Sequence, residues 1–337
     1  MSNIISNSEI KSIISNFDVS ISEYEIVDME VFQGWGTKHL YLLTSPNESF
    51  ILKAKTIDQI AGYDDEVKIC NALLKCGIQS RRPVLTKDGE IFYQKDEFNW
   101  SLMTYITGTP SYCGEYNENT IRSLAEHINQ YVLGSLTNKN LQNLDIKEDL
   151  AEEDMKIMER LVKEEKTLKS NDVLNGTSIT NLFTFIKTGY QKHLQGSQLR
   201  SVIHNDVNAR NILIDHNTKN VVSLIDWDHV RYGNPLKDLS YAIAIFYDNL
   251  PFDTANKYKE IFYKSFTSEW FTSLNKNTVD FAFVFYYTFA KCQSILFYLN
   301  LLKKYDNKYG EEKRFVNEMK NTYSKWISVV GSFLVEN

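Results

Sequence analysis

Apolar and polar residues alternate over three short runs near the beginning of the chain, at residues 24–32, 39–44 and 49–54. Alternation with a period of two is typical of strands that bury one face. Gly34-Trp35-Gly36 and Ser45-Pro46-Asn47 separate these runs and are turn signals. The pattern therefore predicts that the chain begins with a β-rich lobe.

Helical spacing replaces this alternation farther along the chain. Residues 65–74 carry apolar positions three and four apart and stop before Gly77, which predicts a helix. The same spacing recurs from about residue 116 to 199, where the charged stretch 152–168 fits a solvated helical face. It recurs again over 277–336, which is rich in Phe and Tyr. We expect these rings to be mainly core packing, although part of the aromatic surface could line an acceptor pocket.

A further strand pair is predicted at residues 211–214 and 221–225, with the turn signal Asp215-His216-Asn217-Thr218 between them. Three polar residues, His204, Asp206 and Asn211, form the pattern H-x-D-x-x-x-x-N before and at its start, and Asp226 follows its second strand. Phosphoryl transfer needs such a set, because a metal held by Asn and Asp neutralises the phosphoryl charge while another Asp orients the attacking hydroxyl. The sequence thus predicts Asp206 as the catalytic residue and Asn211 and Asp226 as metal ligands.

The chemistry of a carboxylate sets the role expected for Asp206. An ordinary Asp is ionised at neutral pH but is a poor base for an alcohol. A loose transition state removes this difficulty, since the hydroxyl needs orientation early and gives up its proton late. Asp206 is therefore expected to position the hydroxyl and accept its proton late. His204 is expected to be a structural hydrogen-bonding residue, whereas Asp228 could support metal or substrate binding or simply face solvent.

The motif resembles that of the aminoglycoside phosphotransferase and choline kinase superfamily, which are small-molecule kinases. A Gly-x-Pro-x-x-Asp-Leu signature of these enzymes is present at residues 233–239. Protein kinases would carry an Arg between the His and the Asp and a Gly two residues after the metal Asp. This chain has Asn205 and Asp228 at those positions. The resemblance implies an α+β, two-lobed, protein-kinase-like fold with a β-rich N-lobe and a mainly helical C-lobe.

The resemblance also implies a division of labour along the chain. Residues 1–107 would form the nucleotide-binding lobe, and residues 108–337 the helical catalytic and substrate-binding lobe. Lys53, near the end of the third alternating run, would reach the phosphates of ATP or GTP, and Glu66 on the next helix would hold it. Lys55 remains an alternative to Lys53, because the two share a face if the strand continues that far.

Two further segments are candidates for nucleotide contacts. Gly34 and Gly36 occupy the place of a phosphate-covering loop but lack the third glycine of G-x-G-x-x-G, so an ordinary hairpin turn is an open alternative. Residues 100–108 resemble the connector between lobes, whose backbone groups bind a purine. Thr104 and Ile106 are the candidates there. The alternative is a buried strand that ends at a glycine.

Composition narrows the possible partners and location. The chain has 337 residues, 43% hydrophobic and 24% charged, and a net charge of −6. The absence of a Lys/Arg run argues against nucleic-acid and anionic-membrane partners, and the acidic balance mildly favours a cationic substrate. No apolar run reaches about 18 residues and the N-terminus lacks a signal-peptide pattern, so we expect a cytoplasmic location.

The four cysteines lack metal-ligand spacing and are expected to be buried thiols, at Cys70, Cys76, Cys113 and Cys292.

Together these observations predict a kinase that moves the γ-phosphoryl group of ATP or GTP, with Mg²⁺, to a hydroxyl of a small metabolite or antibiotic. An acceptor of the aminoglycoside, choline or homoserine type fits equally well. The alternative is a non-catalytic kinase-fold interaction protein or a spore-coat-type protein. The presence of Lys53, Asp206, Asn211 and Asp226 argues against this alternative.

Overall fold

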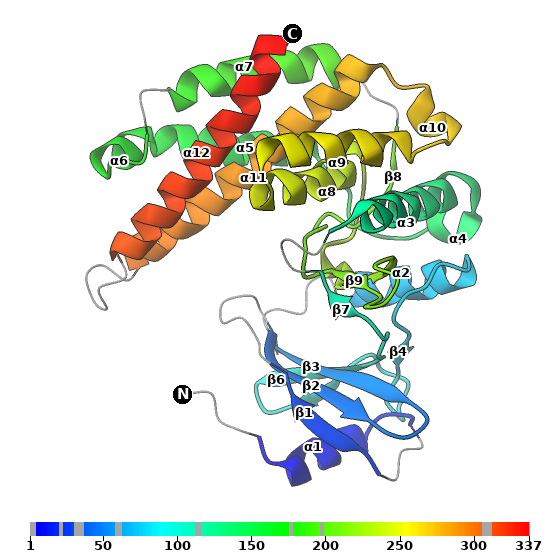
Figure 1. Ribbon diagram of the computed structural model, residues 1–337. Coiled ribbons are helices and arrows are strands. Elements are labelled where there is room, and N and C mark those ends of the chain that lie inside the picture. Colours follow the sequence, from blue (N-terminus) through cyan, green and yellow to red (C-terminus); the bar gives the residue numbers. More distant parts are fainter. Residues whose placement is uncertain are drawn as a thin grey trace. The chain divides into compact units, whose positions relative to one another are not determined.

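The structure is a computed structural model that describes residues 5–19, 23–29, 37–57, 63–111, 116–174, 178–195, 199–304 and 312–336 (Figure 1). The chain divides into two compact units. The first consists of Met1–Pro110, Leu133–Ile146 and Asn211–Val230. The second consists of Ser111–Val132, Lys147–Arg210 and Arg231–Asn337.

A six-stranded antiparallel sheet is the main β structure of the first unit. Its hydrogen-bonded order is β1-β2-β3-β6-β4, and β5 pairs with β6. The strands are β1 (Glu25–Asp28), β2 (Thr37–Thr44), β3 (Ser49–Thr56), β4 (Pro83–Val84), β5 (Tyr93–Lys95) and β6 (Phe98–Thr104). The β-rich beginning predicted from alternation is therefore confirmed.

Helix α1 (Asn7–Ile14) covers part of this sheet (Figure 1). Its residues Ile10, Ile13 and Ile14 are buried in one cluster with Leu52 and Ala54 of β3. Successive side chains of a strand point to opposite faces, so this packing leaves Lys53 and Lys55 together on the other face of β3. The sequence analysis did not predict α1, which is only eight residues long.

The first unit also contains a smaller sheet of order β10-β9-β7. The hairpin predicted over residues 211–225 is confirmed, because β9 (Ile212–Ile214) and β10 (Val221–Leu224) pair antiparallel. Asp215 fixes the turn, since its Oδ1 accepts the N–H groups of Asn217 and Thr218. The other elements of this unit are β7 (Thr109–Pro110), α2 (Tyr63–Lys75), α4 (Lys139–Gln142) and the 3₁₀ helix η2 (Trp227–His229). Helix α2 confirms the helix predicted over residues 65–74.

The second unit is mainly helical and is organised around α11 (Lys276–Lys304) (Figure 1). This helix is apolar on all sides because it packs against α5, α7, α8 and α12. Its rings from Phe281 to Phe289 are buried, which confirms that they are core residues, whereas Phe297 is exposed. The remaining elements are α3 (Glu118–Thr137, shared with the first unit), α5 (Ala151–Lys163), α6 (Glu165–Ser170), α7 (Ile179–His193), β8 (Ser201–Ile203), β11 (Arg231–Gly233), α8 (Leu236–Asn249), α9 (Phe252–Lys264), α10 (Glu269–Thr272) and α12 (Glu312–Glu336).

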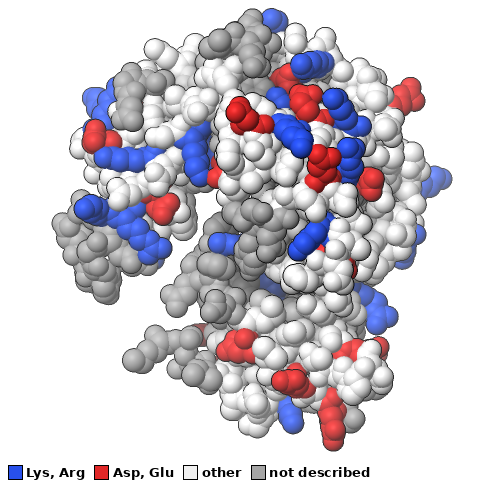
Figure 2. Space-filling model, viewed as in Figure 1, with Lys and Arg blue, Asp and Glu red and all other residues white. Residues whose placement is uncertain are grey.

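Surface charge and cysteine burial complete the picture. Basic and acidic side chains lie interspersed on the face shown in Figure 2. None of the described helices has the length and apolarity needed to cross a bilayer. Cys70 and Cys292 are buried. Cys76 is only partly buried, which corrects the expectation that it is a buried thiol. Cys113 lies outside the described residues. The predicted α+β fold class is confirmed.

Candidate active site

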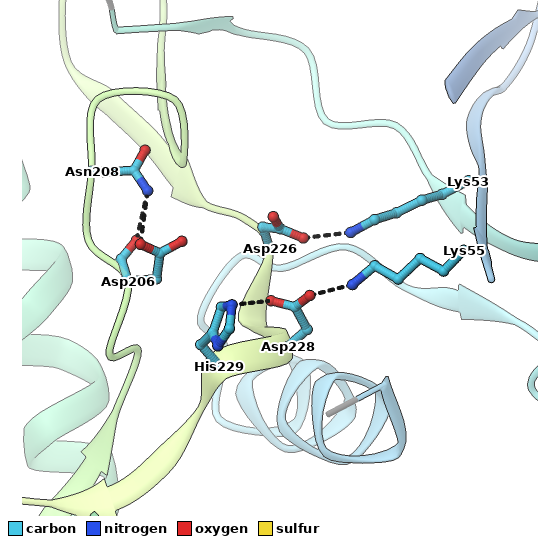
Figure 3. A network of polar contacts seen from close by, with 7 residues as sticks. All are labelled: Lys53, Lys55, Asp206, Asn208, Asp226, Asp228 and His229. Carbon is cyan, nitrogen blue, oxygen red and sulfur yellow. Dashed lines mark hydrogen bonds and ion pairs between the residues drawn. The ribbon is translucent and has the colours of Figure 1, made fainter. Parts of the chain in front are cut away.

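Two lysine–carboxylate pairs stand next to each other in the first unit (Figure 3). Lys53 Nζ lies 2.5 Å from Asp226 Oδ1. Lys55 Nζ forms the second pair with Asp228 Oδ2. We call these four residues the strand-end cluster, because the lysines lie near the end of strand β3 and the acids follow the end of strand β10.

Local backbone structure explains this matched arrangement. Strand β3 runs on to Thr56, so Lys53 and Lys55 share one face, as the sequence analysis allowed. On the other side, Asp226 has a φ of 66°, in the left-handed region, and the 3₁₀ helix starts at the next residue. A left-handed backbone at a non-glycine residue carries strain that surrounding contacts must offset. The ion pair with Lys53 is one such contact.

Asn211 belongs to the same unit as Asp226 and is tied to it through the hairpin. The residue before Asp226, Ile225, donates its backbone N–H to the Asn211 carbonyl oxygen at 2.9 Å. Asn211 is buried. The two predicted metal ligands are therefore held at one end of the same strand pair.

Glu66 on α2 is buried beneath the strand-end cluster. Only 2% of the residue is exposed, and its Oε2 has no hydrogen-bond partner among the described residues. Burial raises the pKa of Glu66 to about 7, and the positive charge of Lys53 opposes this shift. The structure thus gives Lys53 its ion pair with Asp226 and places Glu66 within electrostatic range of both.

Arg81 is a further cation at this site that the sequence analysis missed. Burial lowers the pKa of its guanidinium, and the charges of Glu66 and Asp226 oppose that shift. Arg81 lies in the segment after α2 and belongs to no motif or periodic pattern. Only the fold could have identified it.

The ionisation state of Asp226 follows from these neighbours. Loss of water around the carboxylate would raise its pKa, although 37% of the side chain is still exposed. The charge and hydrogen bond of Lys53, followed by the charges of Lys55 and Arg81, outweigh this effect and hold the pKa of Asp226 well below its usual range. Asp226 is therefore a carboxylate at any pH near neutrality, as a metal ligand must be.

Asp206 lies in the second unit, on the loop that follows β8. Asn208 orients it, because the Asn208 amide nitrogen lies 3.0 Å from Asp206 Oδ1 and 3.2 Å from the Asp206 backbone oxygen (Figure 3). Asn208 Oδ1 in turn accepts the backbone N–H of Arg210 at 2.9 Å. Asn208 was part of the sequence motif but received no role there.

Asp238 holds the start of this loop from below. Its carboxylate accepts the backbone N–H groups of His204 at 2.6 Å and Asn205 at 2.8 Å, and the hydroxyl of Tyr131 at 2.6 Å. Burial raises the pKa of Asp238, and these hydrogen bonds oppose the shift. Asn205 needs such support because its φ is 63°. Asp238 is the acid of the Gly-x-Pro-x-x-Asp-Leu signature, so that signature fixes the loop backbone. His204 is fully buried under the same loop.

The remaining predicted nucleotide contacts fall into two groups. Gly34 and Gly36 lie outside the described residues. Thr104 ends β6, and its backbone N–H donates to the Arg82 carbonyl while its hydroxyl accepts the Arg82 N–H. Ile106 follows β6 and is buried. Their contacts with a purine stay a prediction.

Comparison with known proteins places this site in a family. The model of the phosphotransferase enzyme family matches residues 33–266. Among solved structures, the AMP-bound complex of a spectinomycin phosphotransferase is similar with a TM-score of 0.65 and 18% identity, over 96% of this chain and 98% of that chain. An aminoglycoside phosphotransferase from Streptomyces rimosus, in complex with ADP and streptomycin, has a TM-score of 0.55 and 16% identity, over 83% of this chain and 97% of that one.

A third solved structure, the GDP and kanamycin complex of APH(2″)-IIIa, has a TM-score of 0.63 and 12% identity, over 95% of this chain and 99% of that one. No curated protein sequence matches the chain. The structural matches show a shared fold. Because the family model spans most of the chain, including residues 204–226, the chain belongs to the phosphotransferase enzyme family, as its motifs had suggested.

Proposed function

We propose that this phosphotransferase moves the γ-phosphoryl group of ATP or GTP, with Mg²⁺, to a hydroxyl group of a small molecule. Membership of the family supports a small-molecule kinase that acts on alcohols. The observation that carries the specific proposal is the strand-end cluster together with Asn211. The parts that this proposal uses are the ionised carboxylate of Asp226, the amide of Asn211 and the ammonium of Lys53, all within one compact unit.

The residues at this cluster fit Mg²⁺. The described residues contain no group of three or more His, Cys, Asp or Glu side chains arranged to hold a metal. Mg²⁺ suits such a site, because it takes oxygen ligands and is usually bound by one or two carboxylates together with substrate phosphates. Asp226 and Asn211 would hold it through their side-chain oxygens. The ion would supply positive charge that offsets the charge of the phosphates.

Lys53 provides the second part of the phosphate site. Its ammonium is held at Asp226, and this contact supports the proposal that Lys53 binds phosphate beside the proposed metal ligand. We propose residues 1–107 as the nucleotide-binding lobe, with Gly34, Gly36, Thr104 and Ile106 as nucleotide contacts and Glu66 as the acid behind Lys53. Residues 108–337 are proposed as the catalytic and substrate-binding lobe.

Asp206 is proposed to orient the acceptor hydroxyl and take its proton late in the transfer. The structure supports this role because hydrogen bonds hold both the Asp206 carboxylate and the backbone just before it. Asn208 binds one carboxylate oxygen, and Asp238 holds the backbone of the two residues before Asp206. An orienting group must keep its position within a fraction of an ångström, and these contacts provide that rigidity.

The acceptor is proposed to be a small hydroxylated molecule, with cationic amines preferred. Burial raises the pKa of Tyr241 well above its usual range, and the charges of Asp154, Asp149 and Asp206 add to this effect in that order. These three carboxylates therefore lie within electrostatic range of Tyr241 in the second unit. Asp149 and Asp154 are paired with Lys237, so the preference for an ammonium group on the acceptor rests on the charge of Asp206. The solved relatives that bind spectinomycin, kanamycin or streptomycin agree with this class.

Nucleotide binding is the first test. The melting temperature of the purified chain is measured with ATP and with GTP, each with and without Mg²⁺. A nucleotide at about a hundred times its dissociation constant stabilises a folded protein by roughly 2.7 kcal/mol. We expect a Mg²⁺-dependent shift with at least one nucleotide. The absence of any shift with either nucleotide would count against the proposal.

Phosphoryl transfer is the second test. ADP or GDP release is measured on a panel of amino-alcohols, aminoglycosides and neutral alcohols. The variant Asp206→Asn should retain nucleotide binding and lose about 10²–10⁴-fold in turnover, the usual size of a general-base contribution. Asp215→Asn, in the turn between β9 and β10, is the matched control and should keep full turnover. Equal turnover of the Asp206 variant and the parent would defeat the assignment, and binding without turnover on any acceptor would favour an interaction protein.

A further inference from the structure

The strand-end cluster contains a second ion pair that the proposed function does not use. Lys55 and Asp228 repeat the pair of Lys53 and Asp226 two residues farther along each segment. Two residues of a strand span about 7 Å. The ammonium group of Lys55 is therefore a near neighbour of the proposed phosphate lysine, on the same face of β3.

Burial of this second pair is not explained by stability. Only 7% of the Lys55 side chain and 11% of the Asp228 side chain is exposed. Taking two charges out of water costs several kcal/mol per ion, and a buried pair is often no more stable than apolar side chains of the same size. On the core face of the same strand, Leu52 and Ala54 show that β3 uses apolar residues where packing alone matters.

Asp228 is also incompletely satisfied. Its Oδ2 binds Lys55, but its Oδ1 is buried and has no hydrogen-bond partner among the described residues. This oxygen lies 3.8 Å from His229 Nε2. Buried polar atoms in folded proteins are nearly always hydrogen-bonded, so the hydrogen bond with Lys55 is the contact on which the Asp228 carboxylate depends.

We propose that Lys55 is a second phosphate-binding lysine beside Lys53, and that Asp228 is the residue that positions it for a nucleoside di- or triphosphate. This inference rests on the proposed function. An ammonium group carries three N–H donors, so it can hold Asp228 and a phosphate oxygen at the same time. Lysine binds phosphate as a point charge, and a fixed carboxylate partner keeps that charge in place. Asp228 thereby acts through Lys55 and does not itself touch the nucleotide.

The experiment compares ligands that differ only in their phosphates. Isothermal titration of the full chain is carried out with Mg²⁺ and the triphosphate, diphosphate and nucleoside of whichever base the parent binds. Lys55→Met should weaken binding of the triphosphate and diphosphate by about tenfold or more, the size expected for one charge-assisted hydrogen bond. Binding of the nucleoside should not change. Lys55→Arg, which keeps the charge, should restore most of the lost affinity.

Asp228→Asn tests the positioning role and keeps the proposal testable if Lys55→Met does not fold. We expect a smaller loss of triphosphate affinity, again without effect on the nucleoside, and no further loss when it is combined with Lys55→Met. Lys68→Met is the matched control, because Lys68 lies in the same unit with 43% of its side chain exposed and pairs with Asp65 at 3.6 Å. This variant should bind every ligand as the parent does.

Two results overturn the inference alone. One is a folded Lys55→Met, or Asp228→Asn if the former does not fold, whose triphosphate affinity equals that of the parent. The other is an Asp228→Asn variant that raises the Mg²⁺ requirement while Lys55→Met leaves phosphate affinity unchanged, since Asp228 would then be a metal ligand. A parent that binds no Mg²⁺-nucleotide overturns the proposed function, and this inference with it.

Discussion

Each of the two units contains a cluster of lysine–carboxylate ion pairs, but the surroundings of the two clusters differ. In the strand-end cluster, Asp226 keeps 37% of its side chain exposed and lies at the end of a strand with a left-handed backbone. The Lys237 cluster of the second unit consists of Lys237, Asp149 and Asp154, whose side chains are 2%, 11% and 4% exposed. The Lys237 ammonium also lies over the rings of Tyr286 and Phe289, 5.8 Å and 4.9 Å from their centroids.

This difference in surroundings indicates that the lysine–carboxylate ion pairs of the two clusters have different roles. The Lys237 cluster joins α8, through Lys237, to the start of α5, through Asp154, and it is sealed by aromatic rings. Its ion pairs hold these helices together, although Asp154 Oδ2 has no hydrogen-bond partner among the described residues. The charges of the strand-end cluster lie near strand and loop ends, and its Asp226 remains partly open to solvent. We infer that substitutions will change mainly stability in the first case and mainly activity in the second.

The largest expected effect on stability is that of Lys237→Met. Removal of one partner from a buried ion pair leaves the remaining carboxylates without their counter-charge, which costs about 3–5 kcal/mol. The free energy of unfolding, measured by urea titration, should fall by this amount. The nucleotide-dependent properties of the surviving folded protein should change little. A loss below about 1 kcal/mol would break the comparison, because the cluster would then behave like a surface pair.

The next effect is the loss of turnover in Asp226→Asn. The amide keeps the shape of the side chain but removes the charge that is proposed to hold Mg²⁺. We expect turnover to fall by about 10²–10³-fold, as when one electrostatic contact to a transition state is removed. The free energy of unfolding should change by less than it does in Lys237→Met. Steady-state kinetics and urea titration of both variants, carried out together, measure this contrast directly.

The pH dependence of stability provides a third, smaller contrast. Burial raises the pKa of Glu66 from 4.5 to about 7 and that of Asp154 from 3.8 to about 7. Between those values the folded state keeps a proton that the unfolded state has lost, so stability falls as the pH rises towards 7. Urea titrations from pH 4 to 8 should show this decline. Glu66→Gln and Asp154→Asn should each make it shallower, and a variant with the slope of the parent would exclude its carboxyl as a source.

The smallest effect is expected from Lys303→Met. Lys303 Nζ lies 2.7 Å from Glu164 Oε1, the same distance as Lys237 Nζ from Asp149 Oδ1. Half of the Lys303 side chain is exposed, however, and pairs of this kind contribute roughly 0–1 kcal/mol. Urea titration of the two variants side by side isolates burial as the variable. A loss as large as that of Lys237→Met would show that distance, rather than burial, decides the effect.

Sequence patterns predicted the local elements near the site because those elements follow local rules. The hairpin of β9 and β10, strand β3 and helix α2 were all visible as alternation, turn signals or helical spacing. Helix α1 was missed because eight residues give too few turns for a clear period. The aromatic helix α11 was predicted as a helix whose rings are mainly core packing, and its packing on several sides confirms this for the rings from Phe281 to Phe289.

The sequence by itself determined the chemical identity of the phosphotransferase motif, because His204, Asp206, Asn211 and Asp226 lie within one short stretch of chain. The tertiary structure alone decided how distant charges are matched. It paired Lys55 with Asp228, brought Arg81 into range of Asp226, and placed Asp238 under the loop that carries Asp206. No local pattern encodes these contacts, because each one depends on how separate segments fold together. Each also depends on burial, since a buried charge costs free energy unless it is paired.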